Sequence, residues 1–121
     1  MKTIIIMTIF IITISCIKQN TNYIQINEEY IDFKTLKRDS SLIKTIYIKN
    51  TYPDTIHVDT ITTSCECVTM IRKIKKIPPH QKDSIIFKFK AEETGYISRG
   101  LSILFKDRQE PFQIIIEGEI I

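Results

Sequence analysis

Apolar side chains alternate with polar ones along several short stretches of this chain, and this alternation restricts what it can fold into. Alternation with period two over four to eight residues is typical of a β-strand with one buried face. Isoleucine, whose branched Cβ favours extended backbone over helix, accounts for 28 of the 121 residues. The alternation occurs in six places: residues 31–35, 45–49, 56–58, 85–91, 101–105 and 112–120.

Turn-forming residues separate these stretches, and no segment shows a helical period with caps. Clusters rich in Pro, Gly, Asn, Asp and other polar residues occupy residues 50–54, 78–81, 93–95 and 106–111. Short strands at such spacings are typical of a sandwich of two sheets. The sequence therefore predicts an all-β fold, an antiparallel β-sandwich formed by residues 28–121 as one domain.

The composition argues against several classes of function. A net charge of +3 gives no reason to expect a nucleic-acid partner. Three glycines leave little material for a phosphate-binding loop, and three cysteines are too few for a disulfide-rich scaffold. With 9% aromatic residues and no Trp, the chain offers few platforms on which a sugar ring would stack. We expect no cofactor.

The N-terminus has the features of an export signal. Lys2 precedes an apolar run over residues 4–14, which only Thr8 and Thr13 interrupt. This run is too short for a membrane-spanning helix, which needs about 20 residues. A charged start, a short apolar run and small residues at its end are typical of a secretory signal, and we assign residues 1–15 to it.

The end of this run, residues 13–16, reads Thr-Ile-Ser-Cys and resembles a bacterial lipobox, although Leu is usual where Thr13 stands. The resemblance implies that Cys16 becomes the first residue of the mature chain and carries a lipid anchor in a bacterial membrane. More than one acyl chain makes such attachment stable. Residues 16–27 would then be a polar, lipidated tether, and the domain would stand in the cell envelope, facing the periplasm or the cell surface. Plain secretion and a retained N-terminal strand are the alternatives.

The most specific motif is Ser-Cys-Glu-Cys at residues 64–67. It lies within an ordered series of features: a Phe-containing strand at 31–33, Asn-Thr at 50–51, Pro-Pro at 78–79, Gly95, and Glu-Gly-Glu-Ile at 117–120. This order resembles the bacterial domain-of-unknown-function family 1573, with its Ser-Cys-Gly-Cys motif. The departures are Tyr52, Glu66 and His80, each at a position where the family has glycine.

The resemblance covers residues 30–121 and implies an Ig-like sandwich of about seven strands, related to PapD-like, major-sperm-protein-like and cilia-associated domains. The family is common in lipoproteins of Bacteroidetes. In PapD-like sandwiches, addition of a strand to an exposed sheet edge is a natural way to bind a partner. We therefore expect a non-enzymatic envelope lipoprotein that binds another envelope protein, whose identity the sequence does not give.

Cys65 and Cys67 are open to three interpretations. On an extended strand their Cα atoms would be about 6.5–7 Å apart, whereas a disulfide needs about 4.4–6.8 Å. Pairing therefore requires local contraction, which a central glycine favours and Glu66 does not. Buried free thiols are one interpretation, and a Cys65–Cys67 disulfide is another. The third is a metal-binding or thiol-redox module, for which His57 and His80 are the only histidines.

The remaining polar clusters predict no catalytic site. Asp54, His57, Asp59 and Ser64 include the residue types of a hydrolase, but no nucleophile-elbow motif surrounds Ser64. Because His57 alternates with apolar neighbours, we expect it on the outer, solvated face of its strand. The basic cluster at residues 72–76 predicts a solvated edge or loop, where lysines discourage pairing with other strands.

Overall fold

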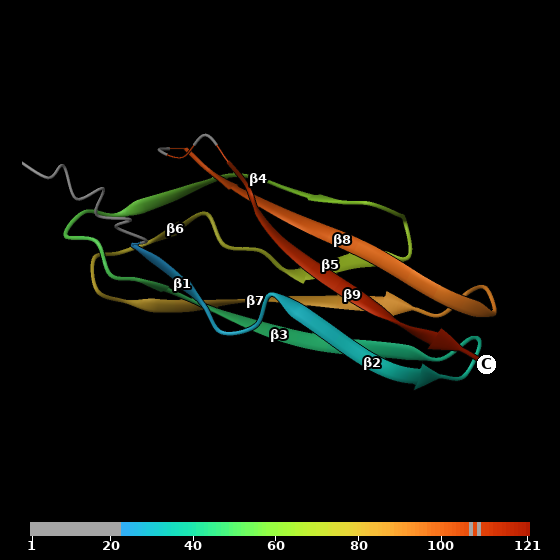
Figure 1. Cartoon of the computed structure of the whole chain (residues 1–121). Helices are drawn as coiled ribbons and strands as arrows, with labels where there is room; N and C mark the ends of the chain where they lie inside the picture. Colours follow the sequence, from blue (N-terminus) through green and yellow to red (C-terminus); the bar gives the residue numbers. More distant parts are fainter. Residues whose placement is uncertain (1–22, 107, 109) are drawn as a thin grey trace, which may run out of the picture.

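Two packed β-sheets make up the computed structural model, which describes residues 23–106, 108 and 110–121 (Figure 1). The four-stranded sheet has the order β1 (Ile24–Ile26), β3 (Ser41–Asn50), β7 (Lys82–Lys90) and β5 (Val68–Arg72). The five-stranded sheet has the order β2 (Tyr30–Leu36), β9 (Phe112–Ile120), β8 (Gly95–Phe105), β4 (Ile56–Thr63) and β6 (Lys76–Ile77). The predicted all-β sandwich is confirmed, with nine strands in the described residues where about seven were expected.

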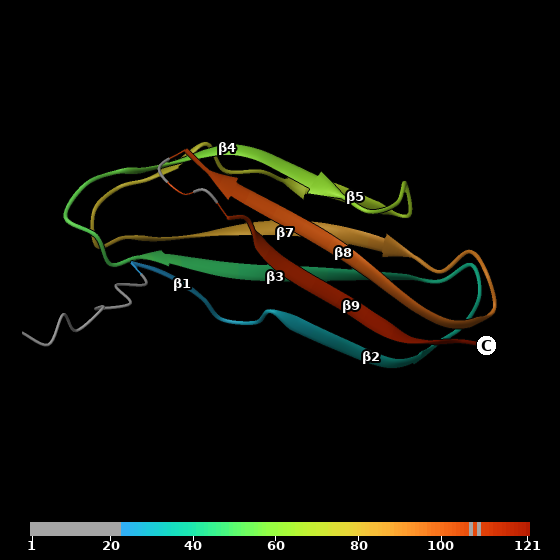
Figure 2. The same cartoon turned by 45° about the horizontal axis from the view of Figure 1, so that its top comes forward.

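One strand pair departs from the expected antiparallel arrangement. β2 lies parallel to β9, with Tyr30 opposite Ile115 and Leu36 opposite Ile120. The cause is that β1 and β2 follow one another in the same direction, β1 on the edge of one sheet and β2 on the edge of the other (Figure 2). All other strand pairs in the described residues are antiparallel.

The folded domain begins earlier than the sequence predicted. Residues 24–26, assigned above to the tether, pair with β3 as strand β1, so the boundary at residue 28 needs correction. Ile24 is buried and Ile26 packs against the core, which explains why this short segment joins the sheet. The predicted signal segment, Cys16 and the tether up to residue 22 lie outside the described residues. Within those residues, no helix has the length and apolar character that crossing a membrane requires.

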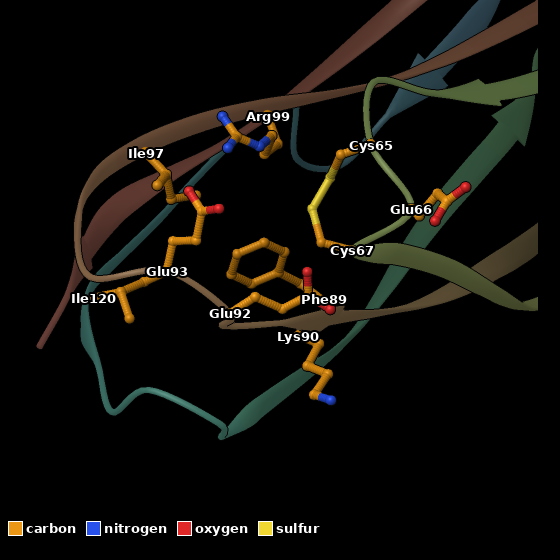
Figure 3. A pocket seen from close by; sticks show the side chains of 10 residues that line it. All are labelled: Cys65, Glu66, Cys67, Phe89, Lys90, Glu92, Glu93, Ile97, Arg99 and Ile120. Carbon is orange, nitrogen blue, oxygen red and sulfur yellow. A yellow bond between two sulfur atoms is a disulfide. The ribbon is translucent and has the colours of Figure 1, made fainter.

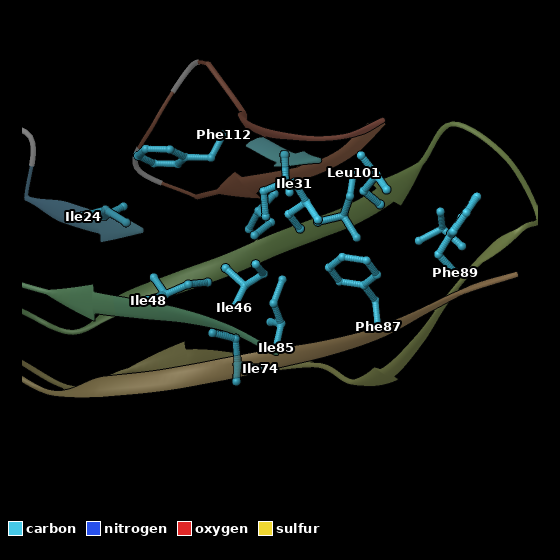
Figure 4. Packing of buried hydrophobic residues seen from close by; sticks show 14 of the residues in the cluster. Ile24, Ile31, Ile46, Ile48, Ile74, Ile85, Phe87, Phe89, Leu101 and Phe112 are labelled. Carbon is cyan, nitrogen blue, oxygen red and sulfur yellow. The ribbon is translucent and has the colours of Figure 1, made fainter. Parts of the chain in front are cut away.

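Isoleucine fills most of the space between the sheets. Of the 20 buried hydrophobic residues in the described part of the chain, 13 are isoleucine. Ile46, Ile48 and Ile85 project from the four-stranded sheet, and Leu101 projects from the five-stranded sheet (Figure 4). The alternation seen in the sequence therefore marks which face of each strand is buried.

Asn50 is the one buried polar residue in the described part of the chain, and it organises one end of the sandwich. Its Nδ2 donates to the carbonyl oxygens of Asp54 at 2.9 Å, Ile77 at 3.0 Å and Pro78 at 3.1 Å. Its Oδ1 accepts a hydrogen bond from the Tyr52 amide at 2.9 Å. This amide therefore joins the end of β3 to the loops that lead into β4 and out of β6.

The three positions that replace the family's glycines differ in backbone conformation. His80, in the turn before β7, has a φ of 57°. Left-handed backbone of this kind costs a residue with a Cβ about 1–2 kcal/mol. Tyr52 and Glu66 are not among the described residues with positive φ. Only His80 therefore occupies a conformation that glycine would adopt more easily.

Replacing this side chain by glycine, His80→Gly, should stabilise the protein by about 1 kcal/mol because the left-handed strain disappears. A gain of that size raises the melting temperature by about 4–8 °C in a domain of this size, measurable by calorimetry. Tyr52→Gly is the matched control, and it should lower the melting temperature, since it adds chain entropy and removes the ring contact with Tyr23. An unchanged or lower melting temperature for His80→Gly would contradict this account.

Candidate functional site

Cys65 and Cys67 are joined by a disulfide in the connection from β4 to β5 (Figure 3). The two cysteines do not lie on an extended strand, because β4 ends at Thr63. The chain then turns, with the Thr63 hydroxyl and the Val68 amide both donating to the Cys65 carbonyl oxygen, at 3.2 Å and 3.4 Å. This turn brings the two Cα atoms to 5.2 Å, within the range that a disulfide requires.

The contraction does not depend on glycine between the cysteines. Glu66 makes the turn without a positive φ, so the argument that its side chain disfavours pairing fails. Of the three interpretations of these cysteines, the structure contains the disulfide. Sulfur atoms bonded to each other are not thiolate ligands, and the described residues hold no group of three or more His, Cys, Asp or Glu placed to bind a metal.

The disulfide lies beside a small hollow at one end of the sandwich, of about 140 Å³ (Figure 3). Both cysteines pack against the hydrophobic core, together with Phe89 from the end of β7. Charged residues of both signs surround the opening: Lys90, Glu92, Glu93 and Arg99. The disulfide therefore helps to cover the core where the chain crosses from the five-stranded sheet to the four-stranded sheet.

The strand that follows the disulfide, β5, forms a free edge of the four-stranded sheet. The Cys67 carbonyl oxygen accepts a hydrogen bond from the Lys90 amide at 2.9 Å, which fixes the start of β5 against β7. Neighbouring residues of a strand direct their backbone groups to opposite sides. The Val68 carbonyl and both backbone groups of Met70 therefore face away from β7, toward the free edge.

The far end of β5 exposes an apolar side chain beside an ion pair. The register shifts between Met70 and Arg72, and Ile71, between them, is 55% exposed. Arg72 donates to the Asp83 carboxylate at 2.9 Å, and this hydrogen bond holds the pKa of Asp83 below its ordinary value of 3.8. Sequence reasoning missed both this edge and Ile71, since β5 is short, its alternation breaks at Met70-Ile71 and its start depends on the preceding turn.

The candidate hydrolase residues do not come together. Ser64 Oγ accepts a hydrogen bond from the Gly100 amide at 2.8 Å, which ties the end of β4 to β8. His57 is exposed and lies seven residues earlier, which is about 23 Å along an extended strand. The basic cluster at 72–76 spans the end of β5, the loop and the first residue of β6, with Ile74 buried and the four cations exposed.

Comparisons with known proteins identify a matching family and several structures with a similar fold. A family model described as "Protein of unknown function (DUF1573)" matches residues 24–120. A protein of unknown function from Porphyromonas gingivalis W83 has a similar structure, with a TM-score of 0.66 and 16% identity over 79% of this chain. This chain spans only 46% of the length of that protein. No curated protein matches the sequence significantly.

Two other similar structures come from proteins with different roles. PapD-like domain 7 of human CEP192 has a TM-score of 0.64 at 10% identity, with 82% of this chain and 85% of that domain covered. The VesB protease of Vibrio cholerae has a TM-score of 0.62 at 8% identity, with 82% of this chain and 32% of that protein covered. At such identities the likeness shows the fold alone.

Removing the disulfide in the double variant Cys65→Ser, Cys67→Ser should destabilise the domain modestly. The loop that it closes is very short, so the loss of chain-entropy stabilisation is about 1.5–2 kcal/mol. The melting temperature should fall by about 6–15 °C in calorimetry. A reductant should lower the wild-type melting temperature by the same amount and leave the double variant unchanged. A reductant effect that persists in the double variant would show that another cysteine is responsible.

Proposed function

We propose that this chain, which belongs to the DUF1573 family of proteins of unknown function, is a non-enzymatic module of the bacterial cell envelope that binds an extended segment of another envelope protein. The free edge of β5 carries this proposal. Its outward backbone groups can pair with an incoming strand, and the exposed side chain of Ile71 gives that strand an apolar contact. The basic residues that follow β5 favour a segment with acidic residues at the corresponding end.

Among the strands at the ends of the two sheets, β5 suits strand addition best. β1 has three residues and β6 has two, so neither offers a long ladder. β2 has seven residues but carries a register irregularity, and Lys34 within it has a φ of 61°. Irregularities of this kind protect an edge from pairing. In β5 the single irregularity comes after Met70, and the preceding disulfide turn holds the start of the strand in place.

The proposed location rests on the N-terminal sequence. If Cys16 carries the lipid, six residues separate it from Tyr23, the first described residue, so seven peptide units join the two. A chain of that length reaches at most about 25 Å. The domain would therefore stay close to the membrane surface, where its β5 edge meets other envelope proteins.

The disulfide supports a second candidate function, thiol–disulfide exchange. Its sulfur atoms lie beside the hollow, next to exposed charged residues. In such an exchange a partner thiolate attacks one sulfur, the other sulfur leaves as a thiolate, and a mixed disulfide forms. An exchange module would be reduced by millimolar thiol in the folded state, whereas a structural bridge resists reduction until the domain unfolds.

Lipid attachment predicts a specific effect of Cys16→Ser. We expect the wild-type full chain, expressed in a bacterium that processes lipoproteins, to partition into the detergent phase and to yield an acylated N-terminal peptide beginning at Cys16. The variant should lose the acyl mass and leave the membrane fraction, because the apolar anchor is missing. Cys65→Ser, Cys67→Ser should keep the acyl mass. An unmodified N-terminal peptide in the wild type would contradict the anchor.

Strand addition at β5 predicts that the variant Ile71→Lys weakens partner binding. A photo-reactive amino acid at position 69 of the full chain, irradiated in the native cells, should give one cross-linked adduct of defined mass with a protein other than this chain. Ile71→Lys should reduce the adduct yield at least tenfold, because a charge at the edge opposes strand pairing. In the isolated complex, the Met70 amide should exchange its hydrogen more slowly.

The matched control is Ile43→Lys, since Ile43 is 61% exposed on β3, which β7 separates from the β5 edge. This variant should leave the adduct yield unchanged. Equal losses for the two variants would indicate a general effect of charge or stability, and the β5 edge would not be the binding site.

A further inference from the structure

The outer faces of the two sheets carry charges of opposite sign. Strand alternation and the paired register place four lysines on the outer face of the four-stranded sheet: Lys49, Lys82, Lys88 and Lys90. The outward positions of β3 and β7 include no Asp or Glu. We call this surface the basic face. It also exposes the apolar side chains of Ile43 and Tyr47.

On the other side of the molecule, the outward positions of β2 and β9 carry Asp32, Glu117 and Glu119. The outward positions of β8 and β9 include no Lys or Arg. This surface is the acidic face. It exposes two aromatic rings, Tyr30 at 54% and Tyr96 at 69%.

Each face contains a pair of like charges in directly opposed positions. Lys49 lies opposite Lys82 on the basic face, and Asp32 lies opposite Glu117 on the acidic face. Like charges directly across a ladder destabilise a sheet. Both pairs lie within strands, where the register fixes their positions. A counter-charge from outside the domain would therefore reduce the repulsion within each pair.

Contacts within the domain relieve these pairs only in part. Lys82 Nζ lies 4.8 Å from the centre of the Tyr47 ring. The Tyr96 hydroxyl donates to the Glu117 carboxylate, and a further hydrogen bond joins Tyr30 to the same group. These hydrogen bonds lower the pKa of Glu117 and raise the pKa of Tyr30 to about 12, so Glu117 remains a carboxylate at neutral pH. Glu119 remains exposed beside it.

We propose that the partner of these faces is a second copy of the chain, with the basic face of one copy against the acidic face of the next. Lys88 and Lys90 are two residues apart on β7, and Glu117 and Glu119 are two residues apart on β9. Both pairs therefore have the same repeat of about 6.6–6.8 Å along their strands. The tyrosine rings of the acidic face supply surfaces over which lysines of the basic face bind.

The geometry of this contact is head to tail. Because the two faces lie on opposite sides of the sandwich, the contact uses different surfaces on the two copies and is not closed by a two-fold axis. An anionic lipid surface would also match the basic face, but it would leave Asp32 and Glu117 without a counter-charge. A second copy supplies counter-charges to both faces, and this contact is independent of the β5 edge.

Zero-length carbodiimide cross-linking, which joins a lysine amine to a carboxylate, tests the contact directly. A mixture of ¹⁴N and ¹⁵N full chains in non-ionic detergent should give heavy–light peptides that join Lys88 or Lys90 to Glu117 or Glu119. The yield should fall at least fivefold between 0.05 M and 0.5 M salt, because the exposed charges are screened. Absence of heavy–light peptides from the wild type would overturn the proposal.

Charge reversal separates this contact from general electrostatics. The double variants Lys88→Glu, Lys90→Glu and Glu117→Lys, Glu119→Lys should each lose at least tenfold in inter-chain cross-linking when alone. Mixing the two should restore it, since each then meets a face of opposite charge. A variant that had failed to fold would not be rescued by mixing.

The control for net charge is the double variant Lys73→Glu, Lys75→Glu, whose side chains lie in the loop between β5 and β6. It should keep the wild-type cross-linking yield. Equal loss in this control would overturn the proposal. Loss of binding to phosphatidylglycerol vesicles in Lys88→Glu, Lys90→Glu without any inter-chain cross-link in the wild type would assign the basic face to a membrane instead.

Discussion

The hydrogen bonds of Asn50 are the interaction on which the arrangement of the sandwich depends. A buried amide must find partners, and Asn50 has acceptors in three carbonyl groups and a donor in the Tyr52 amide. These partners belong to the connections that lead from one sheet to the other. In the described residues no buried side-chain nitrogen or oxygen lacks a hydrogen-bond partner. Aspartate at this position would keep the size of the side chain but lose both N–H donors, and the loops would lose their common point of attachment.

The same residue sets the register from which the surfaces follow. The backbone N–H of Asn50 donates to the backbone carbonyl of Gln81 at 2.9 Å, immediately before β7 begins. That contact places Ile46 opposite Ile85, so both face the core, while Lys49 and Lys82 face outward. A shift of one residue in either strand would send the isoleucines to solvent and the lysines inward. The hydrophobic core and the basic face therefore follow from the same register of β3 and β7. Burial of the isoleucines stabilises this register and so keeps the lysines outward, which the lysines alone would not do.

The sequence predicted the features that depend on local pattern and missed those that depend on three-dimensional neighbours. The alternation of Ile46, Ile48 and Ile85 was enough to predict strands, and the ordered motifs were enough to predict the family. Strand β1 was missed because its three residues are too few to establish a period, and its burial comes from the pairing with β3. The sequence left the pairing of Cys65 and Cys67 undecided because the distance between their Cα atoms depends on the turn after Thr63. Glu66, the one residue between them, does not indicate this turn. The opposed pairs Lys49–Lys82 and Asp32–Glu117 depend on register, which a single sequence does not reveal.

The two proposed uses of the surface are geometrically compatible. A strand added to β5 extends the four-stranded sheet sideways, in the plane of its hydrogen bonds, whereas a second copy stacks on the face perpendicular to that plane. Ile71, at the edge, and Lys88, on the adjacent strand β7, therefore serve different contacts although they belong to the same sheet. The disulfide affects these contacts unequally. It fixes the first residues of β5, so its reduction should loosen the edge, while the register of β3 and β7 depends on Asn50 and the core and leaves the basic face in place.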